Sequence, residues 1–412
     1  MIVFDRFVLN NELRIIVHRD KTTPLAAVNI LYQVGARNEN PERTGFAHLF
    51  EHLMFGGSAN IPCYDEPLQW VGGENNAFTT NDITNYHLTL PAENIETAFW
   101  LESDRMLSLA FTEKSLEVQR SVVIEEFRQR YLNQPYGDVW LHLRPLAYKV
   151  HPYRWATIGI SEKHIAEATM KDVKDFFFSW YAPNNAIMVV AGNVQTHEII
   201  KLSQKWFGGI PKRNISKIKI LQEPEQTKTR RLVLERPVPM DALYIAFQMP
   251  GRMHNDYKPL DIISDLLGNG KSSRLFRTLV MEKKIFGDIE AYITGSIDTG
   301  LLIVEGRLNP GISFESSENA VFEILNELSL NLTETELQKV KNKAEAALIF
   351  NYMDILNKAT SLAFFEMMGD ASLINSELEG YQKVTLKDIK VLSKKYIRKE
   401  NASILYYKSI TK

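Results

Sequence analysis

Cysteine is almost absent from this sequence. Its 412 residues include one cysteine, Cys63, which excludes an intramolecular disulfide and any zinc finger built from cysteines. This thiol has no basic neighbours to activate it, so we expect a loop or packing residue rather than a nucleophile. A disulfide is therefore excluded as the basis of the fold, and a cysteine nucleophile is not expected to be the basis of the activity.

The chain also lacks an excess of one charge and any long apolar run. Lys and Arg total 48 and Asp and Glu total 50, a formal net charge of -2, which argues against nucleic acid or a membrane surface as the main partner. Apolar stretches such as Ala186–Ala191 fall far short of the roughly 18 residues that suggest a membrane span. The first residues are charged and lack the apolar core of a signal peptide. We therefore expect a cytoplasmic protein, or a periplasmic one if a leader has been removed.

The second half of the sequence repeats a segment of the first half. At a constant offset of 216 residues, Thr169–Ala186 and Thr385–Ala402 share six identical residues. Each copy predicts a helix with threonine at its N-cap, then a short loop and an apolar strand. Leu25–Val34 and Met240–Met249 form a weaker pair of strand-like segments. This pattern predicts two homologous domains in tandem.

The order of the predicted elements indicates the fold class. Helices lie between strands without strict β-α-β alternation, which favours an α+β fold whose mainly antiparallel sheets pack against helices. The boundary is expected in the polar, proline-containing stretch Gly208–Thr229. We assign residues 1–215 to the first domain and residues 225–412 to the second.

The stretch Pro41–Gly57 contains a His-x-x-Glu-His pattern, and its middle is predicted to be a helix that ends at a glycine pair. His48 and His52 are four residues apart, so they share one face of this helix and can converge on a metal ion. Glu51 projects beside them and can reach a water on that ion, which is the inverse of the His-Glu-x-x-His arrangement. The alternative is a pair of packed or surface histidines. Two histidines with a carboxylate in register favour the metal.

A catalytic zinc usually has three protein ligands and one open position, so another element should supply a third ligand. Residues 112–132 predict a helix with Thr112 at its N-cap. Glu126 shares one face of this helix with Gln119, and a carboxylate on an apolar face needs a partner or a metal. Glu125 is adjacent to Glu126, and helical periodicity does not separate the two.

Together these residues resemble the pitrilysin, or inverzincin, family of zinc peptidases, which includes the mitochondrial processing peptidase. The resemblance rests on His48-Leu-Phe-Glu51-His52, followed 74 residues later by Glu126. It implies that His48, His52 and Glu126 bind one zinc ion per chain and that Glu51 is the general base. The implied reaction is the hydrolysis of extended peptides, with the zinc in the first domain and no metal site in the second. The resemblance extends to three further segments, Gly72–Thr79, Thr84–Tyr86 and Leu101–Arg105.

The resemblance also implies roles for residues around the zinc. Substrate is expected to add as a β-strand to an exposed edge at Asn76, Ala77, Phe78 and Thr79. Family members often have a second glutamate, seven residues before the third ligand, that braces a ligand histidine. Gln119 occupies that position here and retains the hydrogen-bonding capacity without the charge.

The second half departs from the family pattern. Complete family sites use an arginine and a tyrosine, seven residues apart, to bind substrate, and Val280 and Gly287 occupy these positions. The chain therefore resembles zinc-bearing subunits whose homologous partner supplies the Arg/Tyr pair, and we expect a heterodimer. A homodimer is the alternative, although it would bring no such pair. The competing hypothesis on function is a structural subunit with the same fold and no turnover.

Overall fold

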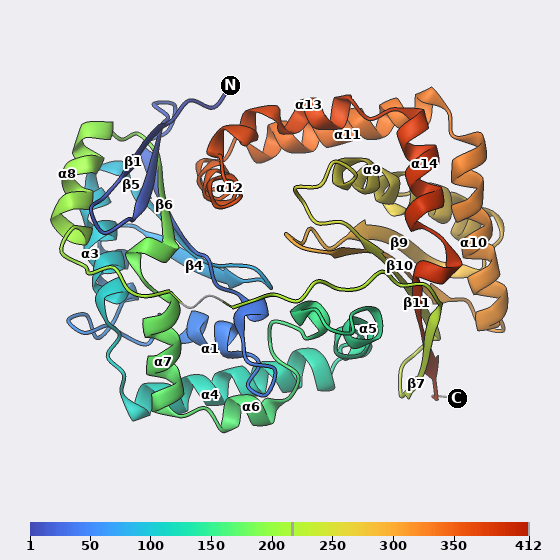
Figure 1. Ribbon diagram of the computed structural model, residues 1–412, viewed down its shortest axis with the longest axis horizontal. Coiled ribbons are helices and arrows are strands. Elements are labelled where there is room, and N and C mark those ends of the chain that lie inside the picture. The colour runs from blue at the N-terminus through green and yellow to red at the C-terminus, as the bar shows by residue number, and fades with distance from the viewer. Residues whose placement is uncertain (216–217, 411–412) are drawn as a thin grey trace. The chain divides into compact units, whose positions relative to one another are not determined.

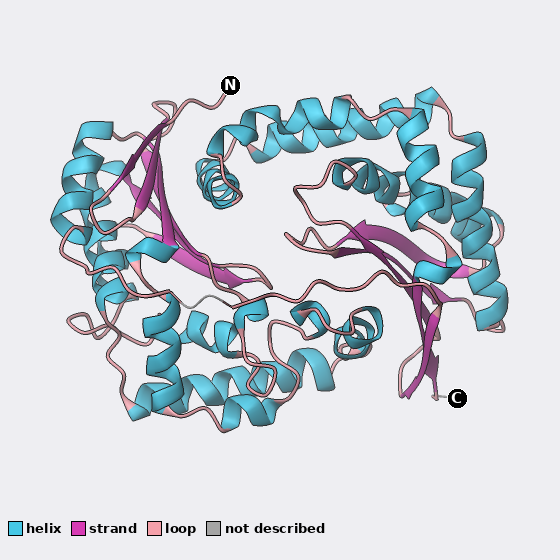
Figure 2. Ribbon diagram, in the orientation of Figure 1, coloured by secondary structure: helices cyan, strands magenta, loops and turns pink. Residues whose placement is uncertain are grey.

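The computed structural model describes residues 1–215 and 218–410, which form two compact units (Figures 1 and 2). Unit 1 comprises Met1–Arg128, Trp155–Ile220 and Ile349–Ser376. Unit 2 comprises Gln129–Arg154, Leu221–Leu348 and Glu377–Lys412. Residues 216 and 217 of the predicted boundary stretch, and residues 411 and 412 of the predicted second domain, lie outside the described residues. Neither unit is continuous along the chain, because each contains a segment from the opposite half.

Unit 1 contains a six-stranded sheet in the order β1-β2-β6-β3-β5-β4. β2 and β6 pair in parallel, and the other neighbours are antiparallel. Among the described residues, β4 pairs with β5 alone, so β4 is an edge strand. The strands are β1 (Asp5–Val8), β2 (Arg14–Arg19), β3 (Leu25–Tyr32), β4 (Glu74–Thr79), β5 (Thr84–Pro91) and β6 (Ala186–Gly192).

Helices from both halves of the sequence pack on this sheet. α12 (Ile355–Met367) comes from the second half and covers one face, where Leu362 joins a buried cluster with Leu31 and Val189 (Figure 1). The other helices of unit 1 come from the first half. They are α1 (Phe46–Leu53), α2 (Asp65–Trp70), α3 (Ile95–Leu107), α4 (Glu113–Phe127), α6 (Glu162–Ala166), α7 (Met170–Trp180) and α8 (Thr196–Phe207).

Charged side chains also join α12 to the sheet. Lys358 Nζ lies 2.7 Å from Asp20 Oδ2, and both side chains are mostly buried. The fully buried Glu366 forms ion pairs with Arg6 and, at 3.8 Å, with Arg14. Because buried charges need partners, these pairs specify where α12 lies on the sheet.

Unit 2 contains a five-stranded sheet in the order β7-β11-β8-β10-β9. The strands are β7 (Arg230–Arg236), β8 (Ala242–Met249), β9 (Phe286–Ile293), β10 (Gly300–Leu308) and β11 (Ala402–Ser409). α5 (Val139–Ala147), from the first half of the sequence, packs on β7, β8 and β11. The other helices are α9 (Tyr257–Gly268), α10 (Phe314–Asn331), α11 (Glu334–Asn351, which belongs to unit 2 through Leu348), α13 (Glu377–Gln382) and α14 (Leu386–Tyr396).

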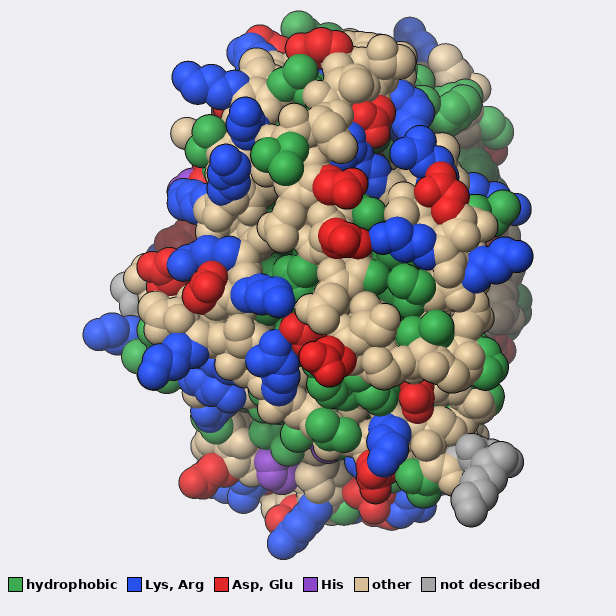
Figure 3. All heavy atoms as spheres, turned by 90° about the vertical axis from the view of Figure 1, so that its right-hand side faces the viewer, with side chains coloured by type: hydrophobic (Ala, Val, Ile, Leu, Met, Phe, Trp, Pro, Cys, Tyr) green, Lys and Arg blue, Asp and Glu red, His purple; other side chains and the backbone are tan. Residues whose placement is uncertain are grey.

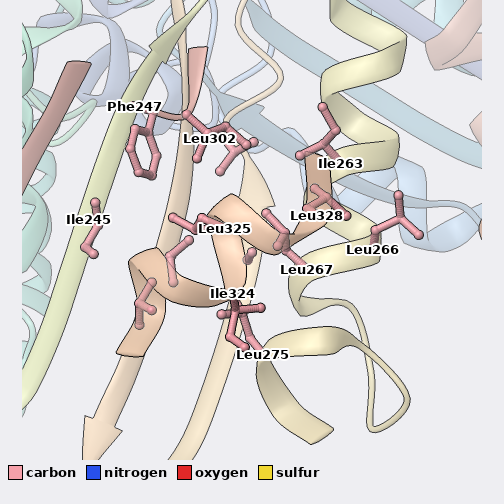
Figure 4. Packing of buried hydrophobic residues seen from close by; sticks show 14 of the residues in the cluster. Ile245, Phe247, Ile263, Leu266, Leu267, Leu275, Leu302, Ile324, Leu325 and Leu328 are labelled. Atoms are coloured by element: carbon pink, nitrogen blue, oxygen red, sulfur yellow. The ribbon is translucent and has the colours of Figure 1, made fainter. Parts of the chain in front are cut away.

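The core of unit 2 lies between this sheet and its helices (Figure 4). Phe247 of β8 and Leu302 of β10 meet Ile263 and Leu267 of α9 and Leu325 of α10. Each of these side chains is almost completely buried, which contributes roughly 1.5–3 kcal/mol per side chain. The chain is therefore long enough to give each unit its own apolar core.

The two units repeat one topology. In each, the first long strand pairs in parallel with the last strand, and the remaining pairs around it are antiparallel. The parallel pairs include Arg14 with Ile187 and Arg230 with Ser403, which differ by the same offset of 216 residues. The predicted α+β fold with two homologous, mainly antiparallel sheets is confirmed.

The repeated helices α7 and α14 begin in the same way. The Thr169 hydroxyl accepts the N–H of Asp172, whose carboxylate accepts the N–H of Thr169 in return. Thr385 and Asp388 form the same capping box at α14. Both threonine N-caps predicted from the repeat are therefore confirmed.

The structure agrees with the composition in two respects, the mixing of charges on the surface and the hydropathy of the helices. Lys and Arg side chains lie interspersed with Asp and Glu on the face shown in Figure 3, so neither sign of charge dominates that face. Within residues 1–215 and 218–410, no helix combines the length and the hydropathy that crossing a bilayer requires.

Candidate metal centre

Helix α1 presents His48 and His52 on one side, one turn apart. Their ring centres lie 4.9 Å apart with nearly perpendicular planes, and the side chains are 14% and 25% exposed. Leu49, Phe50 and Leu53 on the same helix are buried in the core. The apolar residues thus anchor α1, and the two imidazoles remain at the border between core and solvent.

Glu126 of α4 meets both histidines. Its Oε2 lies 3.5 Å from Nε2 of His48 and 3.4 Å from Nε2 of His52. Glu125, its neighbour in sequence, is exposed and is not part of this cluster. The structure thus brings Glu126, rather than Glu125, to the histidines.

These three side chains fit a tetrahedral zinc site. One ligand atom from each of them lies within 4.8 Å of the other two. Ligand atoms about 2.1 Å from a tetrahedral zinc are themselves separated by about 3.4 Å, close to the two distances at Glu126. Two imidazoles and one carboxylate are also a ligand set that catalytic zinc uses, with a fourth position left for water.

Glu51 lies on α1 between the two histidines, and a strand holds its carboxylate. The hydroxyl of Thr79, at the end of β4, donates a hydrogen bond to Glu51 Oε2 at 2.6 Å. The resemblance implied that Thr79 contacts substrate, and this contact with the predicted base was not expected. Thr79 thus links the predicted base to the edge strand.

Two buried tyrosines lie near the Glu51 carboxylate. The Tyr86 hydroxyl lies 3.4 Å from the Phe50 carbonyl oxygen and 3.4 Å from the Tyr181 hydroxyl. Burial raises the pKa of Tyr86 and of Tyr181 well above the usual value, and the charge of Glu51 acts in the same direction. Both tyrosines therefore remain protonated and place no competing negative charge beside Glu51.

The other predicted substrate residues alternate along β4. Phe78 packs against the apolar cluster beneath α12, whereas Ala77 and Thr79 point to the other face of the sheet. Asn76 is exposed, and its side chain accepts the N–H of Ala77 at 2.8 Å. One side of β4 pairs with β5, and the backbone on its other side pairs with no described strand. The role of this edge in substrate binding remains a prediction.

Gln119 lies on α4 two turns before Glu126 and is partly buried. This spacing puts both side chains on the same face of the helix. Its predicted role of bracing a ligand histidine remains a prediction.

The capping of α1 by Glu39 was not predicted from the sequence. Its buried carboxyl accepts the N–H groups of Gly45 at 2.9 Å and Ala47 at 2.8 Å. Burial raises the pKa of Glu39 to about 8, and the N–H groups of Ala47 and Gly45 oppose this rise. One signal was available: Gly45 stands at the N-cap without a side chain, so another residue must accept the N–H groups of the first turn.

Two protein-family models match the chain. Residues 14–156 match a model described as Insulinase (Peptidase family M16), and residues 167–344 match one described as Peptidase M16 inactive domain. His48, His52 and Glu126 all lie in the first of these ranges. The inactive-domain match therefore covers a part of the chain that does not hold the candidate metal ligands.

Individual proteins are similar over nearly the whole chain. The zinc protease PqqE of Helicobacter pylori is 29% identical over 409 residues, which are 97% of this chain and 91% of that protein. The mitochondrial-processing peptidase subunit beta of Saccharomyces cerevisiae is 25% identical over 367 residues, covering 83% of this chain and 77% of that protein. The crystal structure of a protease from Helicobacter pylori matches with a TM-score of 0.92 and 28% identity, covering 99% of this chain and 100% of that chain.

Proposed function

The chain belongs to the M16 family of peptidases, and from that premise we propose that it is a zinc-dependent endopeptidase that hydrolyses extended peptides. One observation carries the proposal: Glu126 meets both histidines of α1 at 3.4 and 3.5 Å, on the helix that also bears Glu51. The name of the Helicobacter pylori relative, a zinc protease, supports it.

His48, His52 and Glu126 would hold one zinc ion per chain. When bound, zinc supplies Lewis-acid activation of the attacking water and of the scissile carbonyl. The protein supplies the position of this site, since α1 and α4 carry the ligands on facing sides. Gln119 would support a ligand histidine from the α4 face.

Glu51 is the proposed general base. Its carboxylate takes a proton from the attacking water and delivers it to the amine that leaves. The Thr79 hydroxyl donates to one oxygen of this carboxylate at 2.6 Å, which restricts the orientation of the base.

The proposed substrate position is the open edge of β4. An extended peptide added beside Asn76, Ala77, Phe78 and Thr79 would form main-chain hydrogen bonds with the strand. Because Thr79 belongs to this strand and also contacts Glu51, a peptide bound there is brought close to the proposed base. Main-chain pairing selects extended peptides over folded proteins.

We further propose that a homologous partner subunit completes the site. Val280 lies in a short helical turn at Phe276–Glu282, and Gly287 lies in β9, so neither position offers a donor side chain. The loss of one hydrogen-bond donor to the transition state lowers kcat by about 10²–10³-fold. The yeast relative is named as a subunit, which agrees with a heterodimer of a zinc-bearing chain and an Arg/Tyr-bearing chain.

A second candidate is a non-catalytic subunit that organises a partner. The features that favour it are Val280 and Gly287, because they remove the family's substrate donors. Glu51 argues against it, since zinc binding and folding do not require a base beside the histidines. We therefore retain the peptidase as the proposed function.

Cleavage of a quenched, unstructured peptide mixture by the zinc-loaded chain tests this proposal. Wild-type chain, alone or with a homologous Arg/Tyr-bearing subunit, is expected to cleave. The Glu51→Gln variant is expected to bind zinc equally well and to lose at least about 10²-fold in rate, because general-base catalysis contributes about 10²–10⁴-fold. Full activity of Glu51→Gln would refute the assigned base. Stoichiometric zinc without cleavage in any combination would favour the non-catalytic subunit.

A further inference from the structure

Helix α6 and the residues around it contact α4 and the residues that lead into α1, the two helices that carry the candidate zinc ligands. We call this segment, residues 159–168, the brace. It belongs to unit 1, packs against α4, and hydrogen-bonds to the residue that precedes the N-cap of α1.

The first contact joins the brace to the start of α1. The buried Thr44 donates its N–H to His164 Nδ1 at 3.1 Å, and its hydroxyl lies 2.9 Å from the same nitrogen. The hydroxyl oxygen also accepts the N–H of Ile160 at 2.8 Å. Because Nδ1 accepts the N–H of Thr44, it carries no proton, and the hydroxyl must be the donor in the second contact. The N–H and the hydroxyl of Thr44, the residue just before the N-cap, thus share the lone pair of His164 Nδ1.

Two glycines let the backbones come together at this contact. A Cβ atom on Gly45 would lie 2.5 Å from the Ile158 carbonyl oxygen and 2.7 Å from Cδ1 of Ile165. A Cβ atom on Gly159 would lie 2.9 Å from the Thr44 carbonyl oxygen. Both glycines also have positive φ angles, 89° and 101°, which other residues rarely adopt. The start of α1 is therefore held against the brace at a distance that only glycine allows.

The second contact joins the brace to α4. Arg128, which directly follows α4, donates two hydrogen bonds to the Glu162 carboxylate, at 2.8 and 3.3 Å. About two turns further into α4, Arg120 donates to the carbonyl oxygens of Ala166 at 3.2 Å and Ala168 at 3.0 Å. These contacts lie on either side of Glu126 in the sequence of α4, so they hold the part of the helix that carries the third candidate ligand.

We propose that the brace sets the position of α1 relative to α4, with His164 as a positioning residue for the zinc site. The inference rests on the proposed function, because it concerns the same metal. α1 has eight residues, which is too short for a helix to be stable by itself. The separation of the histidines from Glu126 therefore depends on contacts made outside the two helices. His164 touches neither the ligands nor the substrate edge, and it acts through Thr44.

Three variants of the full chain test this role. His164→Ala removes the acceptor, whereas His164→Asn keeps one, because the Asn Oδ1 can take the place of Nδ1. His18→Ala is the matched control, since His18 is a histidine of unit 1, itself buried, whose Nδ1 makes one hydrogen bond, with the Val3 carbonyl oxygen at 2.7 Å. The measurements are the zinc dissociation constant, from competition with a chromophoric chelator, and the unfolding midpoint.

We expect His164→Ala to bind zinc about tenfold more weakly, at the low end of the range for residues that support metal ligands. We expect His164→Asn to restore the wild-type affinity, and His18→Ala to lower the unfolding midpoint without changing the affinity. Hydrogen exchange should show faster exchange of the α1 amides in His164→Ala alone.

Other outcomes would overturn the inference. Wild-type affinity in His164→Ala would do so, as would equal zinc loss in His164→Ala and His18→Ala, because the effect would then be general destabilisation. Failure of His164→Asn to restore affinity would exclude the hydrogen bonds as the cause. If the wild-type chain binds no zinc, the proposed function itself fails. If wild-type chain binds zinc and His164→Ala binds it equally well, only the role of the brace fails.

Discussion

Glu125 and Glu126 are adjacent on α4, yet they lie in different surroundings. Glu126 faces the two histidines, whereas Glu125 is exposed. We expect Glu126→Gln to weaken zinc binding by well over about 10²-fold, more than the loss of a supporting residue causes. Glu125→Gln is the matched control and is expected to retain wild-type affinity, measured by the same chelator competition. Equal affinities in the two variants would contradict the assignment of the third ligand.

Thr79 allows a second test of single-residue roles. Thr79→Val keeps the shape of the side chain but removes the hydroxyl that donates to Glu51. Loss of this bond to a charged group is expected to lower kcat by about tenfold or more, equivalent to about 1.4 kcal/mol. Zinc affinity should not change, because Thr79 is not in the ligand cluster. A raised KM with an unchanged kcat would instead assign Thr79 to substrate binding, as the family resemblance implied.

The pair of glutamates shows how far local sequence can define a site. The four-residue spacing of His48 and His52 is sufficient to predict that they share a helix face. Neighbouring residues on a helix point about 100° apart, so the choice between Glu125 and Glu126 depends on which side of α4 meets α1. That orientation arises from long-range packing, to which the brace contributes, and no local pattern encodes it. The Thr79 contact with Glu51 is equally long-range, since it joins a strand to a helix.

At the scale of secondary-structure elements, a partly buried carboxylate on α9 predicts a pH effect on stability. Burial raises the pKa of Asp261 from 3.8 to about 6, and the charge of Asp265 adds to the rise, although the hydrogen bond from Tyr381 and the charge of Arg252 oppose it. Because the pKa of Asp261 is higher in the folded chain than in the unfolded chain, protonation of Asp261 stabilises the fold. This contribution to the free energy of unfolding is complete below about pH 3.8 and is lost as the pH rises through about 6.

We therefore expect Asp261→Asn to remove part of the decline in the free energy of unfolding between pH 4 and 6. The asparagine retains an acceptor for the Tyr381 hydroxyl, so the packing of α9 against α13 is preserved. Urea unfolding at several pH values measures the effect. A variant whose pH dependence parallels that of the wild type would show that Asp261 does not titrate in this range.

Several elements could be predicted well because their signals are local. The capping boxes of α7 and α14 and the strands that follow these helices appear where the 216-residue repeat predicts them. The helix predicted at residues 112–132 begins after Thr112, as expected, but α4 ends at Phe127 and continues as a wider helical turn through Leu132. The repeat therefore predicted the common topology, because two copies of one pattern strengthen each other.

At the scale of the whole molecule, each sheet depends on a helix from the opposite half of the sequence. α12 covers the sheet of unit 1, and α5 packs on the sheet of unit 2. Hydrophobic periodicity shows that a helix has an apolar face, but it does not show which sheet covers that face. The assignment of residues 1–215 and 225–412 to two domains was made without that information.

Because each unit contains a helix from the opposite half of the sequence, we can predict how fragments of the chain behave. We expect residues 1–220 alone to expose apolar surface and to bind a hydrophobic dye, because α12 is missing. Fusion of residues 349–376 through a flexible linker should restore a cooperative unfolding transition and reduce dye binding, although α5 still lacks the sheet of unit 2. The same fusion carrying Leu362→Asp is the control, since it places a charge in the α12 interface. Cooperative unfolding of residues 1–220 alone would show that α12 is dispensable.

The position of α12 late in the sequence also affects the order of events on the ribosome. The last strand of the first sheet ends at Gly192, and α12 begins at Ile355. At synthesis rates of about 5–20 residues per second, roughly 10–30 seconds pass between the synthesis of this last strand and the synthesis of α12, which covers the sheet. A chaperone that recognises apolar β-surfaces is therefore expected to bind the nascent chain in this interval and to leave after Met367 emerges. Sequencing of chaperone-bound ribosomes would locate both events along the message.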